Sequence, residues 1–249
     1  MRSSLNVFFS FVGAFVVWQL IIVLYPVSPL LLPSPFVVIQ AVSDIVLTTE
    51  GLEHIGSTMF RFVFGLGIGL ANGLLLGLAF GVLPRLKKFL WPWVDFARSI
   101  PPPALIPLAL LFWGVDNTSR IILIAFVTSL IMVVCTLAGI EALSPVRRAV
   151  ALNFGYTKYE LVYRVLVPEL LPQLSAGVRI SISYALIVTI VGEMFIGTEY
   201  GIGHAILSAQ LTYETASMYA YIVVIGLIGY FLNTLYVALE RRYVHWSGK

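Results

Sequence analysis

The chain has 249 residues, of which 59% are hydrophobic and only 11% are charged, and its mean hydropathy is +0.97. Soluble domains carry about 25% charged residues, and a domain of this length has too little interior to bury so much apolar surface. The composition therefore excludes a cytosolic enzyme, a disordered chain and a secreted disulfide scaffold. The formal net charge of +3 matters less than where the basic residues lie, and we predict no nucleic-acid partner.

Six apolar runs are candidates for membrane spans, each of which takes roughly 20 helical residues. The predicted spans are 7–25, 60–83, 100–115, 121–140, 176–197 and 219–239. A signal peptide is the alternative for the first run, but the run is long for one and no small-residue cleavage motif follows it. The third run is short and begins with three prolines. We predict an all-α polytopic membrane protein in which 1–249 form one transmembrane domain.

The orientation follows from the basic residues. If the N-terminus is cytoplasmic, all of the 15 Lys and Arg residues except Arg61 and Arg120 fall on the inner side. Cytoplasmic loops carry the excess of Lys and Arg in membrane proteins. Both termini are therefore predicted to be cytoplasmic, which agrees with an even number of spans.

Two connections are long enough to hold helices of their own. In the outer one, Ser34 and Pro35 precede apolar residues at helical spacing, which predicts a short amphipathic helix at the outer membrane surface. The inner segment, 141–177, reads as two short helices. Ser144 is predicted to cap the first, which is expected to end at Gly155 with φ > 0. Thr157 is predicted to cap the second and Pro168 to stop it.

The basic residues of this inner segment have two alternative partners. They could bind anionic lipid headgroups, or they could dock a cytoplasmic protein.

No constellation for catalysis or metal binding is visible. The three histidines, His54, His204 and His245, lie in different loops without ligand-like spacing, so no metal site is predicted. Neither a G-x-S-x-G nucleophile motif nor a G-x-x-x-x-G-K-[ST] phosphate loop occurs. The chain is therefore not expected to be an enzyme, and it cannot hydrolyse ATP by a phosphate loop of its own.

The second predicted span carries a glycine at every fourth position. Small residues at this spacing let another helix approach closely. The approach is either packing within the chain or packing across a sliding or dimer interface. The predicted helix-packing residues are Gly65, Gly69, Gly73, Gly77 and Gly81.

Polar residues inside spans are costly and are candidates for the substrate pathway. The predicted pathway residues are Asn72, Ser181, Tyr184, Thr189 and Glu193. Serine and threonine can instead bond to their own helix. Glu193 either lines a wet pathway or reaches the outer surface.

The inner segment resembles the EAA loop of binding-protein-dependent ABC-transporter permeases, whose pattern is E-A-A, three residues, G, nine residues, I-x-L-P. With Gly155 as the anchor, 149–151 take the E-A-A positions and Pro168 falls on the proline. The acidic position is Ala149 here, and Arg147, Arg148, Lys158 or Glu160 is a candidate to replace it. The ATPase-coupling residues that the resemblance implies are Arg147, Arg148, Ala151, Gly155, Lys158, Glu160 and Pro168.

Other segments resemble the nitrate, sulfonate, taurine and bicarbonate branch of these permeases. They are Leu32-Pro-Ser-Pro35 with His54, Ser57, Arg61 and Gly65; Ile100 to Leu108 with Trp113-Gly114; Gly192-Glu193-Met194 with Gly201-Ile-Gly203; and the terminal Glu240-Arg-Arg242 with Trp246. The resemblance covers nearly the whole chain.

The resemblance implies the multi-pass permease subunit of an ABC importer in a bacterial inner membrane. It implies a second permease copy or a paralogue, two separate ATPase subunits that bind ATP and Mg²⁺ and dock at 141–177, and an extracytoplasmic solute-binding protein. No cofactor is expected in this chain itself. Membrane lipid is expected to surround its spans. The implied substrate is a small anion such as a sulfonate, taurine, nitrate or bicarbonate.

Three alternatives are kept. The first is import of a neutral or cationic pyrimidine precursor. An integral membrane enzyme is disfavoured because no buried acid, base or nucleophile cluster is visible. A passive channel does not account for the long basic inner segment.

Overall fold

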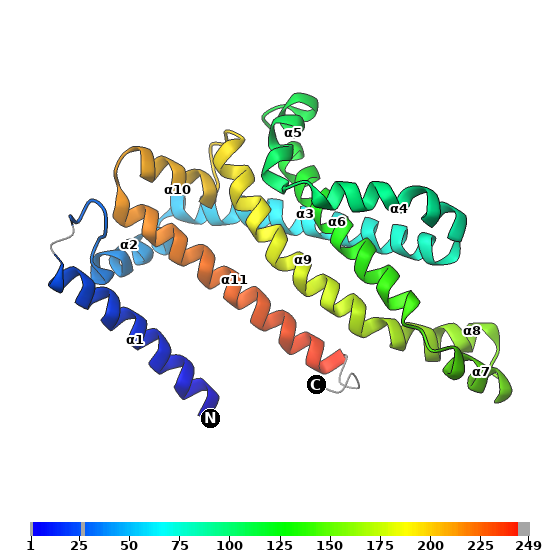
Figure 1. The fold of residues 1–249 in the computed structure, drawn as a ribbon. Helices are drawn as coiled ribbons and strands as arrows, with labels where there is room; N and C mark the ends of the chain where they lie inside the picture. The colour runs from blue at the N-terminus through cyan, green and yellow to red at the C-terminus, as the bar shows by residue number, and fades with distance from the viewer. Residues whose placement is uncertain (1, 26–27, 244–249) are drawn as a thin grey trace. The chain divides into compact units, whose positions relative to one another are not determined.

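The computed structural model describes residues 2–25 and 28–243, and within them the chain is helical without a strand (Figure 1). The all-α prediction is thus confirmed. The elements are α1 (Arg2–Leu24), α2 (Pro35–Leu47), α3 (Thr49–Val82), α4 (Pro84–Ser99), the 3-10 turn η1 (Pro102–Leu105), α5 (Ile106–Trp113), α6 (Asn117–Glu141), α7 (Pro145–Asn153), α8 (Lys158–Leu161), the π turn η2 (Val162–Leu166), α9 (Val167–Phe195), α10 (Ile202–Leu211) and α11 (Thr215–Tyr243).

Four helices in the described part are long and apolar enough to cross a membrane: α3, α6, the continuous helix 159–195 and α11. A fifth candidate is broken, because α4 and the segment 102–113 meet at a bend of 101°. Segment 100–115, predicted as the third span, is therefore a 3-10 turn followed by the eight-residue α5. Prolines without N–H groups explain the break. The count of six spans and the orientation stay predictions.

The predicted outer amphipathic helix is α2. Ser34 is its N-cap, and the Ser34 side chain accepts a hydrogen bond from the Val37 amide at 3.4 Å, with Pro35 at the first helical position. Val38 and Ile45 are buried on one face, while Phe36 and Ile39 are exposed on the other. The signals for this helix are local, which is why the sequence alone reveals it.

The chain gathers into two compact units. The first contains the described residues of 1–58 and 199–228, and the second those of 59–198 and 229–249. The first unit has a small core drawn from α2, α10 and α11. Its buried apolar residues include Val38, Ile45, Ile202, Ile206, Ala220 and Val224.

The second unit is built around α6 and α9, which pack along each other. Residues from α3, α5, α6 and α9 share its main core. The buried members are Phe62, Ile106, Leu123, Ile124, Val127, Ala185, Val188 and Ile196. This arrangement brings the part of α3 around Arg61, the start of α6 and the C-terminal end of α9 together, and it leaves α7 and α8 at the other end of α9 (Figure 1).

The repeated glycines of α3 face α6. A Cβ added at Gly65 would lie 2.6 Å from the Cβ of Ile124, and one added at Gly73 would lie 2.5 Å from the carbonyl oxygen of Ser129. A Cβ at Gly77 would lie 2.5 Å from the Cβ of Thr136. Gly69 and Gly81 meet Thr128 and Ile140 still more closely. Of the two alternatives for the glycine repeat, the structure has packing within the chain, with α3 and α6 in near contact.

Candidate coupling loop and the ion pairs of helix α9

Helix α7 begins and ends as its sequence predicts. The Ser144 side chain accepts a hydrogen bond from the Arg147 amide at 3.3 Å, and Pro145 opens the helix. At the other end Gly155 has φ +78°. The Gly155 amide bonds to the Leu152 carbonyl at 3.0 Å and the Tyr156 amide to the Ala151 carbonyl at 3.1 Å. This is a Schellman turn, in which a glycine takes the left-handed position at no steric cost.

Helix α8 has the predicted cap. Thr157 Oγ1 accepts from the Glu160 amide at 3.2 Å, and Glu160 Oε2 accepts from the Thr157 amide at 3.1 Å. These reciprocal bonds make a capping box.

The prediction that Pro168 stops this second helix is wrong. The chain continues from α8 through the π turn η2 into α9, in which Pro168 lies in the first turn. In a regular α-helix the proline ring would clash with the carbonyl group four residues earlier. The backbone widens just before the proline, where the Val167 amide bonds to the Val162 carbonyl five residues back. Helix α9 therefore begins at 167, well before the predicted start of the fifth span at 176.

Where their side chains are described, the predicted coupling residues differ in burial and in partners. Ala151 is buried, whereas the backbone around Gly155 and the Arg147 side chain are exposed. Glu160 lies 3.9 Å from Arg164, and Arg147 pairs elsewhere. The side chains of Arg148 and Lys158 lie outside the described residues.

The partner of Arg147 is Glu169, which the sequence analysis did not identify. Glu169 Oε1 lies 3.0 Å from Arg147 Nη2 and accepts a hydrogen bond from the Ser144 amide, also at 3.0 Å. Its side chain is only 9% exposed. A sequence signal exists, since an acid directly after Pro168 is well placed in the first turn of a helix. A helix predicted to stop at Pro168 leaves Glu169 in a connection, where its charge has no such place.

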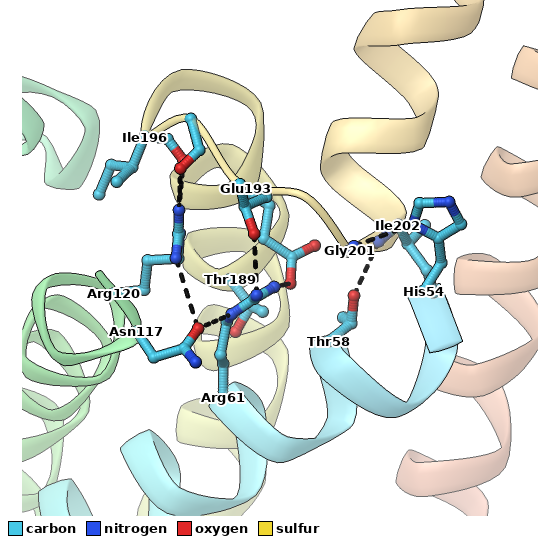
Figure 2. A network of polar contacts seen from close by, with 12 residues as sticks. His54, Thr58, Arg61, Asn117, Arg120, Thr189, Glu193, Ile196, Gly201 and Ile202 are labelled. Carbon is cyan, nitrogen blue, oxygen red and sulfur yellow. Dashed lines mark hydrogen bonds and ion pairs between the residues drawn. The ribbon is translucent and has the colours of Figure 1, made fainter. Parts of the chain in front are cut away.

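At the other end of α9, Glu193 is fully buried and ion-paired (Figure 2). Arg61 on α3 donates from Nη1 to Glu193 Oε1 at 2.6 Å, from Nε to Asn117 Oδ1 at 2.7 Å and from Nη2 to Thr198 Oγ1 at 3.0 Å. Arg61 itself is 4% exposed. Of the two alternatives for Glu193, the outer surface is wrong because the side chain is fully buried, and the wet pathway stays a prediction. The signal available in the sequence was that Arg61 and Glu193 have opposite charges and are both predicted near the outer membrane surface.

Arg120 completes this network from α6. It is 3% exposed, and its Nη2 donates to the Ile196 carbonyl at 2.6 Å and to the Gly197 carbonyl (Figure 2). The last carbonyl groups of a helix have no partners within the helix. A cation placed there is also stabilised by the negative end of the helix dipole. Arg120 thereby satisfies the chain just past the end of α9.

Asp116, the N-cap of α6, precedes this network in the chain. The Asn117 amide donates to one Asp116 carboxylate oxygen at 2.6 Å, and the Thr118 hydroxyl donates to the other at 3.0 Å. The hydrogen bond from the Asn117 backbone amide is the largest cause that lowers the pKa of Asp116 below its usual value, and the hydrogen bond from the Thr118 hydroxyl is the second.

The remaining pathway candidates differ in burial and in hydrogen-bond partners. Thr189 is buried and bonds back to the Ala185 carbonyl at 2.7 Å, as threonine often does in helices. Ser181 is also fully buried, and its hydroxyl has no hydrogen-bond partner among the described residues. Tyr184 is half exposed and lines an apolar cavity of about 290 Å³ between α6 and α9. Asn72 is exposed on α3.

The first unit contains a polar pocket of about 480 Å³. His54 Nδ1 accepts from the Gly201 amide at 3.0 Å, and Thr58 Oγ1 accepts from the Ile202 amide at 2.8 Å (Figure 2). These bonds fasten the start of α10 to α3. The pocket is lined by His54, His204, Tyr221 and the carboxylates Asp44, Glu50, Glu199 and Glu214. No three of the described His, Cys, Asp and Glu residues are grouped so as to hold a metal.

The family model described as the binding-protein-dependent transport system inner membrane component matches residues 69–245, which are 177 of the 249 residues. The chain belongs to this family. The protein is thus a multi-pass permease component of a binding-protein-dependent ABC transporter and not an enzyme, because ATP hydrolysis in such systems belongs to partner ATPase subunits.

Relatives and solved structures agree with this membership. The permease is 28% identical to the taurine transport system permease protein TauC of Escherichia coli K12, over 94% of this chain and 86% of that protein. It is 27% identical to the formylaminopyrimidine transport permease protein ThiX of Halalkalibacterium halodurans, over 89% of this chain and 88% of that one. A chain of the MetNI methionine ABC transporter, solved in inward-facing conformations, shares the fold with a TM-score of 0.59 at 19% identity, over 85% of this permease and 98% of that chain.

Proposed function

We propose that this permease forms one half of the translocation pathway of an ABC importer in a bacterial inner membrane. A second copy or a paralogue supplies the other half, and an extracytoplasmic solute-binding protein delivers the substrate to the outer side. Two cytoplasmic ATPase subunits bind ATP and Mg²⁺ and dock on the segment 141–177. Family membership is the observation that carries the proposal.

The shape of the inner segment supports a protein partner there. Helix α7 and the turn after it expose large apolar side chains, among them Val146 at 70% and Phe154 at 80%. Tyr159 and Tyr163 on the next helix are exposed as well, with stacked rings 6.4 Å apart. Exposed apolar groups gathered beside charged ones are typical of protein–protein contacts. A surface that bound lipid headgroups alone would not need two rigidly capped helices.

The substrate class follows less directly from the relatives. TauC and ThiX carry names for chemically different cargo, and their identities to this chain, 28% and 27%, do not separate the two. The charges of the second unit favour a small anion such as a sulfonate. At the Glu193 end of α9, two buried guanidinium groups, Arg61 and Arg120, stand against the buried carboxylate of Glu193, while the nearby carboxylate of Asp116 is exposed to water and screened. The excess of buried positive charge attracts anions more than cations.

Import of a pyrimidine precursor is the second candidate, and its support is the relationship to ThiX. A binding screen on the partner solute-binding protein separates the two candidates. Taurine, alkanesulfonates, nitrate, bicarbonate and formylaminopyrimidines are compared by thermal shift. Stabilisation by a sulfonate or another oxyanion is expected, whereas stabilisation by pyrimidines alone would replace the anion proposal.

The complex itself is tested by purification. A tagged permease, expressed with its neighbouring genes, is expected to copurify with an ATPase subunit that hydrolyses ATP. Uptake into vesicles should require ATP. Uptake without ATP and without any associated ATPase would show a passive channel instead.

The orientation is tested by labelling. Cysteines at Glu50 and Lys158, in a Cys135→Ser background, should react with a membrane-impermeant thiol reagent from opposite sides. If both cysteines react from outside intact cells, the predicted orientation is wrong.

A further inference from the structure

Helices α7 and α8 are capped in different ways. In a capping box, the residue three positions after the N-cap is an acid that accepts a hydrogen bond from the N-cap amide. Helix α8 follows this rule, since Glu160 stands three positions after Thr157 and bonds to its amide. In α7 the same position holds Arg147, which has no acceptor atoms.

The missing acid of α7 comes from another helix. Glu169, in the first turn of α9, accepts the hydrogen bond from the Ser144 amide across 25 residues of sequence. We infer that Glu169 is a positioning residue that completes the capping box of α7 and thereby fixes the orientation of α7 relative to α9. The inference rests on the proposed function, in which α7 is the helix that meets the ATPase.

The Ser144 bond dominates this anchor. Arg147, the other partner of Glu169, has a side chain that is 66% exposed, and ion pairs with an exposed member contribute little. The carboxylate of Glu169, by contrast, is 9% exposed and accepts from a backbone amide, so the bond is charge-assisted and shielded from water. Its negative charge also lies at the N-terminus of α7, where the helix dipole favours it.

The arrangement accounts for a chain that has Ala149 where its relatives' motif has an acid. Glu169 places a carboxylate beside the start of α7 from the neighbouring helix. The carboxylate is 9% exposed and its Oε1 faces both the Ser144 amide and Arg147, whereas Oε2 is buried without a hydrogen-bond partner among the described residues. Because it is buried, it serves to hold α7 rather than to reach a partner. Movement of α7 is then transmitted to α9 directly, without passing through the intervening turn.

The test measures the orientation of α7 and the coupling ratio in the same assembled complex. Spin labels are placed at Val146→Cys on α7 and Arg179→Cys on α9, both exposed positions, in a Cys135→Ser background. Glu169→Ala removes the acceptor, whereas Glu169→Gln keeps an acceptor oxygen without the charge. Asp95→Ala is the matched control, since it removes an acid from an exposed ion pair with Arg98 within α4.

In Glu169→Ala, we expect the distance distribution between the labels to broaden and the substrate transported per ATP hydrolysed to fall about tenfold or more, the loss expected for a hydrogen bond to a charged group. Glu169→Gln should keep most of the parental coupling, and Asp95→Ala all of it. A change confined to the yield of complex, with parental label distances and coupling in the complex that assembles, would overturn the inference. So would unchanged distances in Glu169→Ala. If no ATPase joins even the parental permease, the proposed function fails, and the label distances still decide whether Glu169 anchors α7.

Discussion

Helix α9 carries a buried acid near each end, and the two acids have different kinds of partner. Glu193 is fully buried and pairs with Arg61, whose side chain is 5% exposed. Glu169 is almost as buried, but its cation, Arg147, is 66% exposed. The two carboxylates are 24 residues apart, or about 36 Å along the helix axis. Both ends of the helix thus carry a carboxylate–arginine pair, but both members are buried at one end and the arginine is exposed to water at the other.

Burial of the cation decides what each pair contributes. Removing one member of a buried pair leaves an uncompensated charge in a medium that solvates it poorly, and this costs far more than the intact pair contributes. A partner in water keeps its hydration when the pair breaks. The Glu193 end of α9 should therefore be intolerant of substitution, whereas the Glu169 end should tolerate loss of its cation and not of its acid.

The largest expected effect is at the Glu193 end of α9. Arg61→Ala should lower the free energy of unfolding of the second unit by about 3–5 kcal/mol, because Glu193 is left buried without its cation. The measurement is the thermal unfolding midpoint and the yield of folded complex in detergent. Arg98→Ala, which removes an exposed arginine, is the control.

The double variant Arg61→Met with Glu193→Leu sharpens this test. Replacing both charges by apolar groups of similar size should recover much of the lost stability. If Arg61→Ala is as stable as the parent, the two ends of α9 do not differ in the way that burial predicts.

The next effect concerns the helix that carries Arg61. Gly73→Leu on α3 should destabilise the packing of α3 on α6 by about 1–3 kcal/mol or more, because the added side chain meets the backbone of Ser129, which cannot move aside easily. Assembly and transport are measured. Gly67→Leu is the matched control, since a Cβ at Gly67 meets nothing within 4 Å. Equal tolerance of both substitutions would show that the glycine face does not hold α3 in place.

A smaller and more local effect is expected at the turn after α7. Gly155→Val forces a β-branched residue into φ +78°, at a cost of roughly 1–2 kcal/mol. The spans should still insert, but ATPase docking or the coupling of hydrolysis to transport should weaken. Gly155→Asn is the control, because asparagine accepts the left-handed conformation more readily. If Gly155→Val copurifies with the ATPase and transports substrate as well as the parent does, the segment 141–177 is not the coupling element.

The smallest effect should come from the exposed cation of the inner pair. Arg147→Ala should reduce coupling by less than about fivefold, which corresponds to the contribution of an exposed ion pair. Charge reversal of Arg147 together with Arg148 should act weakly if both face lipid headgroups, at about 1 kcal/mol each, and strongly if they contact the ATPase. Substrate uptake by Arg147→Ala is measured in parallel with uptake by Glu169→Ala, and the two losses rank the contributions of Arg147 and Glu169. A loss in Arg147→Ala as large as in Glu169→Ala would contradict the ranking by burial.

Features whose causes are local could be predicted from the order of residues alone. Composition requires a helical membrane protein, and cap residues such as Ser34, Ser144 and Thr157 mark helix starts because their side chains bond amides two or three residues away. Gly155 ends α7 because only its neighbours in the chain take part in the turn. The four-residue glycine repeat likewise reveals a close-packed face from one helix alone, although not which helix it meets.

Tertiary structure alone decided the contacts that join distant segments. The sequence shows Arg61 and Glu193 but not that they meet across 132 residues, and Glu169 bonds to Ser144 across 25. At Pro168 the local rule for proline failed, because a π turn removed the clash that the rule assumes. A side chain's partner depends on where the packed helices bring it, and burial then sets the strength of the interaction. Neither quantity can be read from the order of residues.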